Sequence, residues 1–141
     1  MAEHEHLIQW QEGFEAWNKW RAENQDTRPN LLGADLSWAS LLWADLNDTD
    51  MRRVNLNGAN LSGARLIGAD LRFANLTMTD LRGANMGGSN LSGANLTGAN
   101  LTGVNLHGAD LSETRLTGAR YNSATRWPIG FDVNASGAIL G

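Results

Sequence analysis

Large apolar residues recur at every fifth position along most of the chain. Of the nineteen positions from 31 to 121 in steps of five, sixteen are leucine, two are methionine and the last is tyrosine. A second apolar position lies two residues earlier, where alanine occurs twelve times between Ala34 and Ala119 and the other residues are small. The residue just before each leucine is mostly Asp or Asn, and the residue two after it is mostly Gly from Gly58 onward.

A period of five fits neither a helix, whose face repeats every 3.6 residues, nor a strand, whose face repeats every two. It fits a chain that turns a corner every five residues and directs one large and one small side chain inward. Four such sides close a coil of about 20 residues, and successive coils stack at about 4.8 Å. The narrow interior leaves room for only a small side chain beside each leucine. The repeat centres expected in this core are Leu36, Leu41, Leu46, Met51, Leu56, Leu61, Leu66, Leu71, Leu76, Leu81, Met86, Leu91, Leu96, Leu101, Leu106, Leu111 and Leu116.

The repeated units read GADLS, GANLS, GANLT and GADLR, and this pattern resembles the A(D/N)LXX repeat of the pentapeptide-repeat family. The match runs from Pro29 to Ser123 in one register. The resemblance implies an all-β solenoid, a right-handed quadrilateral β-helix with an N-terminal α-helical cap. We therefore expect three segments: a capping amphipathic helix in residues 1–28, a β-helix of about 4.75 coils in 29–123, and a capping tail in 124–141.

The N-terminal segment has the pattern of an amphipathic helix from His6 to Asn24. Its apolar face consists of Leu7, Trp10, Phe14, Trp17 and Trp20. Because a stack of coils exposes apolar cross-sections at its ends, we interpret this helix as a cap. Trp38 and Trp43 take outward positions in the first coil, and we expect the helix to cover them. The alternative is a helix that binds a membrane surface or a partner. Membrane binding is disfavoured because residues 1–28 carry six acids and three bases.

The C-terminal segment breaks the period and carries compact apolar residues. Trp127 and Phe131 are expected to close the second end of the stack. The alternative is a self-association surface, since the resemblance implies that some family members dimerise through this end. The expected oligomeric state is therefore a monomer or a weak homodimer formed through a terminus.

Side chains twenty residues apart should stack in columns along the coils. Because several columns are rich in Asn, we expect ladders of side-chain hydrogen bonds between coils, as in cross-β structures. One column carries Asp50, Asp70 and Asp110, but a straight column does not bring together the six or more oxygens of a Ca²⁺ site.

Residues for catalysis are scarce. The chain has three His and no Cys, which excludes thiolate zinc sites and Cys nucleophiles. A filled, narrow coil also offers no cleft for a carboxylate pair. We therefore expect no catalytic residue, no metal site and no cofactor.

Charge and hydropathy favour a soluble, cytoplasmic protein. The formal net charge is −4, there is no apolar run of bilayer-spanning length and no secretory leader pattern. Neither nucleic acid nor membrane is an expected partner. Beyond the first coil, the outward apolar residues are Ile67, Phe73 and Met78. Arg53 lies one coil from Phe73, so a cation–π contact is possible there, and Ile67, Phe73 and Arg53 form a candidate patch for a protein partner.

Two functions follow as hypotheses. The first is a non-catalytic structural or protein-interaction module with an unidentified protein partner. The second rests on the resemblance, which implies that some members imitate DNA and modulate DNA gyrase. Residues 29–123 carry eight acids and seven bases, a net charge of −1. Duplex DNA carries one negative charge per ~1.7 Å, so the near-neutral repeat region disfavours the second hypothesis.

Overall fold

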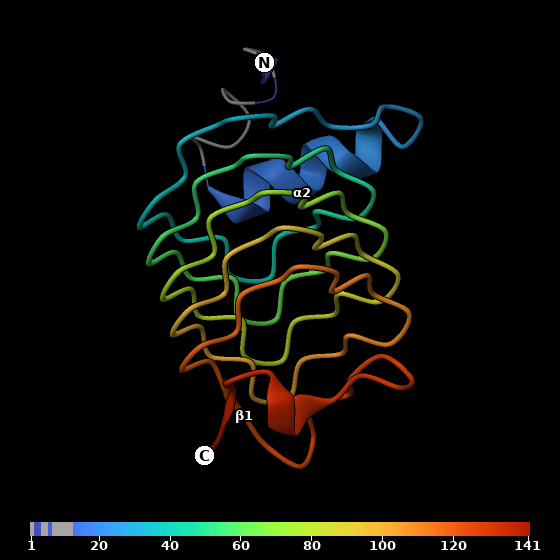
Figure 1. Ribbon diagram of the computed structural model, residues 1–141. Helices are drawn as coiled ribbons and strands as arrows, with labels where there is room; N and C mark the ends of the chain where they lie inside the picture. The colour runs from blue at the N-terminus through green and yellow to red at the C-terminus, as the bar shows by residue number, and fades with distance from the viewer. Residues whose placement is uncertain (1, 4–5, 7–12) are drawn as a thin grey trace.

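The computed structural model describes residues 2–3, 6 and 13–141, and Figure 1 shows them as a stack of similar coils between a helix and an irregular tail. The helix is α2 (Phe14–Glu23) at the N-terminal end of the stack. The tail contains a 3₁₀ helix, η1 (Val133–Ala135), and the strand β2 (Ile139–Leu140), which pairs in parallel with β1 (Arg120–Tyr121).

Each coil contains twenty residues. Isolated parallel bridges join residues twenty positions apart, except in the last pair, Asn105–Arg126. The first four pairs are Asn30–Asp50, Asp35–Asn55, Ser40–Asn60 and Asp45–Arg65. Four columns of bridges therefore run along the stack, one on each side of the coil. We name these sides face A, face B, face C and face D in the order of those four pairs.

The corners explain why glycine follows the leucine. At each corner a backbone N–H donates to the carbonyl of the leucine three residues earlier, as from Ala59 to Leu56 at 2.9 Å. The third residue of such a turn has a positive φ, which is +68° at Gly58. Glycine adopts this conformation at no steric cost, as in the third position of a type II turn.

The Asp or Asn before each leucine stabilises the same turn locally. Its side-chain Oδ1 accepts a hydrogen bond from the backbone N–H two residues later, at 3.0 Å from Thr77 to Asn75 and at 3.1 Å from Asn57 to Asn55. The predicted ladders of Asn side chains are wrong for most of the stack, where the hydrogen bonds to these oxygens come mainly from their own turns. Between described Asn side chains of different coils, one hydrogen bond is present, from Asn105 Nδ2 to Asn85 Oδ1 at 3.2 Å.

The interior of the stack is filled with leucine, methionine and alanine. The predicted repeat centres are buried, except that Leu111 in the last coil is partly exposed. Small polar residues at the alanine positions are satisfied within the core. The hydroxyl of Thr79, for example, donates to the carbonyl of Leu56 in the preceding coil at 2.8 Å.

Side chains of α2 replace a preceding coil on face D. In later coils the backbone of this face forms hydrogen bonds with the coil before and the coil after it. The first coil has no preceding coil to bond to. Asn18 Oδ1 accepts from the Asp45 N–H, and Trp17 Nε1 donates to the Asp45 carbonyl, both at 2.7 Å. Arg21 donates to the carbonyls of Asp45 at 3.1 Å and Asn47 at 3.0 Å. The helix thus caps the stack through polar groups as well as through buried indoles.

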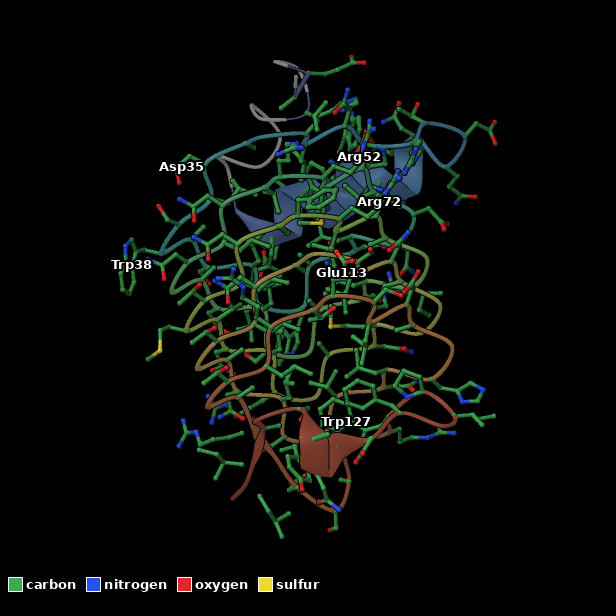
Figure 2. The ribbon with its side chains drawn as sticks, in the orientation of Figure 1. Asp35, Trp38, Arg52, Arg72, Glu113 and Trp127 are labelled. Atoms are coloured by element: carbon green, nitrogen blue, oxygen red, sulfur yellow. The ribbon has the colours of Figure 1, made fainter. Side chains whose placement is uncertain are left out.

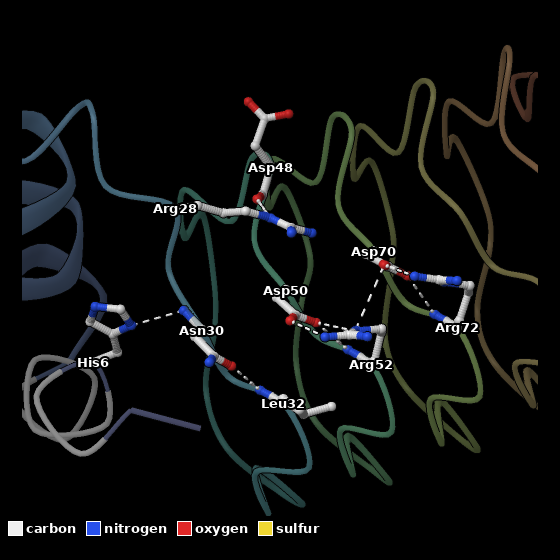
Figure 3. Close-up of polar contacts among 9 residues, drawn as sticks. All are labelled: His6, Arg28, Asn30, Leu32, Asp48, Asp50, Arg52, Asp70 and Arg72. Atoms are coloured by element: carbon white, nitrogen blue, oxygen red, sulfur yellow. Dashed lines mark hydrogen bonds and ion pairs between the residues drawn. The ribbon is translucent and has the colours of Figure 1, made fainter. Parts of the chain in front are cut away.

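Two N-terminal residues complete the cap on face A. The Asn30 N–H donates to His6 Nδ1 at 2.8 Å (Figure 3), and the Glu3 N–H donates to the Asn30 carbonyl at 3.0 Å. Of the predicted capping face, Trp17 and Trp20 are buried and Phe14 is partly buried. Leu7 and Trp10 lie outside the described residues.

At the other end the bridges continue beyond residue 123, where the repeat was expected to stop. Arg126 bridges to Asn105, and the Thr125 hydroxyl donates to the Leu101 carbonyl at 2.8 Å, as Thr79 does in its coil. One additional residue before this unit shifts its register, which hides it from a strict period of five. Trp127 stacks on Phe131 with ring centroids 5.1 Å apart, and both rings are partly buried.

Candidate interaction surface

Four large apolar side chains at the corners are exposed. The exposed fractions are 74% for Trp38, 60% for Trp43, 55% for Phe73 and 62% for Met78. Together with Arg53 we call these residues the aromatic surface. The prediction that the helix covers Trp38 is wrong, since most of this side chain is exposed at the outer edge of the stack (Figure 2). Trp43 makes an edge contact with Phe14 at 6.2 Å but stays mostly exposed.

The corner side chains extend toward the following coil, away from the helix. The indole of Trp38 lies against Gly58, where a β-carbon would stand 2.3 Å from the ring atom Cζ3. Trp43 lies against Gly63 in the same way: a β-carbon on Gly63 would stand 2.2 Å from Cδ1 of the Trp43 ring. Each tryptophan thus packs part of its ring against a glycine twenty residues later, and most of the side chain stays exposed to solvent. This direction explains why α2 does not cover them.

Phe73 and Arg53 form the predicted contact. The Arg53 guanidinium carbon lies 5.1 Å from the centroid of the Phe73 ring, within the range of a cation–π interaction. The Phe73 ring in turn rests on Gly93. Ile67 is 43% exposed but belongs to face D, and the side chains of face A separate it from Phe73. Of the predicted patch, Arg53 and Phe73 therefore lie together, and Ile67 lies apart from them.

Met78 lies in the same corner column as Trp38, two coils further along, and its sulfur rests on Gly98. The sequence carries this relation as a spacing of forty residues, but it becomes visible only once the coil length is known. Beside Met78 a hollow of about 330 Å³ is lined by Asp80, Arg82, Asn100 and Arg120.

Charged residues lie beside Met78, but the second coil between these side chains is polar and uncharged on faces B and C. The outward residues of the second and third coils on face B are Asn55, Asn57, Asn75 and Thr77, and Asn60 and Ser62 occupy the second coil of face C. Cores of protein interfaces are enriched in aromatic residues, Met and Arg and depleted in charge. The aromatic surface has this composition.

Face A, by contrast, carries charges that neutralise one another. Arg52 and Arg72 each reach the aspartate two residues earlier at 2.7 Å, and Arg52 Nε lies 3.9 Å from Asp70 (Figure 3). The hydrogen bond from Arg52 lowers the pKa of Asp50 against the opposing effect of burial, and Arg72 does the same for Asp70.

The described residues contain no cluster of three or more His, Asp or Glu side chains that could hold a metal ion. His107 lies exposed on face D beside Asn105. Within the part of the chain that the structure describes, no helix has the length and apolar character needed to cross a bilayer.

Comparisons with known proteins agree with this geometry. A profile of pentapeptide repeats matches residues 49–88 and 79–118, in eight copies. No curated protein sequence matches the chain. Among solved structures, a pentapeptide repeat protein from the thylakoid lumen of Arabidopsis thaliana is 32% identical with a TM-score of 0.66, covering 75% of this chain and 70% of that one.

Two further solved structures differ in their sequence identity to this chain and in their TM-scores. HetL, a pentapeptide repeat protein from Nostoc involved in regulating heterocyst differentiation, is 31% identical with a TM-score of 0.58, over 81% of this chain and 56% of its own. QnrB1, a plasmid-mediated fluoroquinolone resistance protein, is 19% identical with a TM-score of 0.40, over 76% of this chain and 60% of its own. The Arabidopsis protein and HetL imply a right-handed β-helix for this chain.

Proposed function

Because the chain belongs to the pentapeptide repeat family, we propose that it is a non-catalytic module that binds another protein through the aromatic surface. The observation that carries the proposal is the exposure of Trp38, Trp43, Phe73 and Met78, all more than half exposed, on three neighbouring corners. Burying a side chain of this size contributes about 1.5–3 kcal/mol, which an interface gains and the isolated chain does not.

Folding alone does not account for these residues. All four have positive φ, from 57° at Met78 to 62° at Trp38, at corners where most other coils carry glycine. A residue with a β-carbon costs roughly 1–2 kcal/mol in this conformation. Large apolar residues therefore destabilise these corners without adding to the core, which favours a role in binding.

The filled interior supports the non-catalytic part of the proposal. Leu56, Leu76 and Leu96 have no exposed surface, and leucine, methionine and alanine side chains pack together inside the coils. An active site needs a concave pocket with convergent polar groups. The hollow beside Met78 instead provides a seat for one partner side chain, with Arg120 at its rim.

Imitation of DNA is less favoured. Asp45, Asp50, Asp70 and Asp80 each form an ion pair with an arginine. Duplex DNA presents unpaired phosphates at one charge per ~1.7 Å along its axis. The paired carboxylates do not reproduce such a row, so the proposal places binding on the aromatic surface.

Affinity capture with matched variants tests the proposal. The wild-type chain, a Trp38→Asn/Met78→Asn variant and an Ile67→Asn control are immobilised and exposed to extract of the native host. Asn tolerates positive φ, so the double variant keeps its fold. We expect a discrete protein on the wild type and on the control, and a loss of at least tenfold on the double variant. Equal capture by all three would contradict the proposal, as would inhibition of gyrase supercoiling with no protein captured.

A further inference from the structure

The C-terminal tail adds one more rung to three sides of the last coil. On face D the Leu106 N–H donates to the Arg126 carbonyl at 2.7 Å, and on face B the Gly118 N–H donates to the Gly137 carbonyl at 3.0 Å. On face C the strand β2 pairs with β1. These contacts continue the ladder of the preceding coils.

Face A receives no such rung. In the coil before it, the N–H groups of Leu91 and Gly93 donate to the carbonyls of Asp110 and Ser112 at 2.8 and 2.9 Å. The equivalent N–H groups of Leu111 and Glu113 have no acceptor among the described residues, and the Ala109 carbonyl has no donor there. Face A thus ends in an open strand edge, one side long, with two donors and one acceptor at ladder spacing. Unpaired edges of this kind are templates for another strand.

A hollow lies directly beside this edge. It has a volume of about 310 Å³ and is lined by Ala109, Leu111 and Ser112 of the last coil and by Pro128, Ile129 and Phe131 of the tail. Leu111 is the predicted repeat centre that stays partly exposed, and Ile129 is 90% exposed. The hollow is large enough to receive an apolar side chain from a strand placed on the edge.

The charge of this edge differs from that of face A further up the stack. Asp50 and Asp70 are followed two residues later by an arginine, whereas Asp110 is followed by Ser112, which donates to it at 2.6 Å. Glu113 adds a second exposed carboxylate on the same rung. The open edge is therefore acidic, and an incoming strand gains from a basic residue.

We propose that this edge binds an extended segment of another protein as one additional parallel rung. The segment's backbone pairs with Leu111, Glu113 and Ala109, an apolar side chain fills the hollow, and a Lys or Arg faces Asp110 and Glu113. Strand addition of this kind takes its affinity from the main chain and its specificity from the side chains.

A second copy of this chain fits the edge less well than a separate peptide. The tail already pairs with faces B, C and D, so the gap admits a single extended segment and not another stack end. Two copies joined through their open edges would also place Asp110 and Glu113 of each against those of the other, which repel.

Selection of linear peptides tests the proposal. A phage library of random twelve-residue peptides is panned on the wild-type chain, and selected peptides are measured on three variants. We expect peptides that combine apolar and basic residues, and a weakening of at least tenfold in an Asp110→Lys/Glu113→Lys variant. Asp48→Lys, at an exposed acid near the other end, should bind as the wild type does. Trp38→Asn should also bind normally, which separates this site from the aromatic surface.

Amide hydrogen exchange of the complex gives the second readout. The bound peptide should slow exchange at Leu111 and Glu113 at least tenfold and leave the first coils unchanged. Failure to select any linear peptide would overturn the proposal, as would binding without protection at these two amides. Protection that grows with protein concentration alone, without peptide, would show that a second copy occupies the edge and would also overturn it.

Discussion

The indole of Trp38 rests on Gly58 of the next coil, at a position where any β-carbon would overlap the ring. Trp43 and Gly63 are related in the same way. A large corner side chain and a glycine twenty residues later therefore form a matched pair. The glycine both adopts the positive φ of its own corner and leaves room for the ring above it.

Gly58→Ala tests this pairing. Its φ of +68° predicts a loss of roughly 1–2 kcal/mol in the free energy of unfolding, measured with urea. Gly103→Ala is the control, since its φ is +71° and the nearest heavy atoms are 3.8 Å away. The exposed ring can swing aside, so both variants should lose similar stability. The indole N–H resonance of Trp38 should shift in Gly58→Ala alone; an unshifted resonance would contradict the pairing.

The cap depends on Arg21, which donates to two carbonyls and to the Thr49 hydroxyl of the first coil. Hydrogen bonds from a charged donor contribute about 1.5–3 kcal/mol each when buried, and less where water reaches them. We expect Arg21→Met to lower the free energy of unfolding by about 2 kcal/mol and to speed amide exchange in the first coil. Lys19→Met, on the exposed side of α2, should change neither. Equal effects of both variants would show that α2 does not act through these bonds.

The local turn bond of the Asp or Asn positions can be tested at Asn75. Asn75→Ala removes the acceptor of the Thr77 N–H and should cost about 1 kcal/mol by thermal or urea unfolding. Asn75→Asp keeps an oxygen in place and should recover most of the loss. Arg115 lies in the same column, and its side chain accepts no hydrogen bond from the Thr117 N–H. Arg115→Ala should therefore leave the stability almost unchanged. If Asn75→Ala were as neutral as Arg115→Ala, the Asn preference would need another cause.

Acid should destabilise the fold through the Asp–Arg pairs. Hydrogen bonds from Arg52, Arg72 and Arg82 lower the folded-state pKa of their aspartates below the ordinary value of 3.8. A carboxyl shifted in this direction stabilises the fold above its unfolded pKa, and the stabilisation is lost as pH falls through the folded pKa. The free energy of unfolding should therefore decrease below about pH 4.

Replacing all three arginines by Gln should make this acid dependence shallower. The arginine side chains are 41–60% exposed, so the change is modest. Unfolding by urea between pH 2 and 6 measures it. Identical slopes for the wild type and the triple variant would show that these pairs do not govern the acid response.

The sequence predicts the interior of this protein better than its surface. The leucine period determines which residues point inward, because a five-residue side has no other way to bury one large and one small residue. The outward position of Trp38 was predicted correctly, but its covering by the helix was not, because the ring packs on Gly58, a neighbour in space that is twenty residues away. The Asn ladders were predicted wrongly because the Asn oxygens bond mainly to the backbone of their own turns, which the spacing of the columns does not reveal.

The ends were less predictable than the coils. One additional residue after Tyr121 displaces the last unit from the period, so Thr125 and Arg126 were assigned to the tail. The open edge on face A has no pattern of its own in the sequence. It arises because the tail pairs with faces B, C and D and leaves the Leu111 N–H without an acceptor among the described residues.

Every surface described for this protein depends on the twenty-residue coil, and a disulfide pair measures that register directly. The chain has no cysteine, so Thr77→Cys/Thr97→Cys introduces a single pair on face B of adjacent coils. Rungs about 4.8 Å apart satisfy disulfide geometry. We predict that this pair oxidises rapidly and almost completely in the native state. The two cysteines of a Thr77→Cys/Ser92→Cys control lie on different faces and should stay reduced. Oxidation of the control pair, or failure of the first pair to close, would contradict the account.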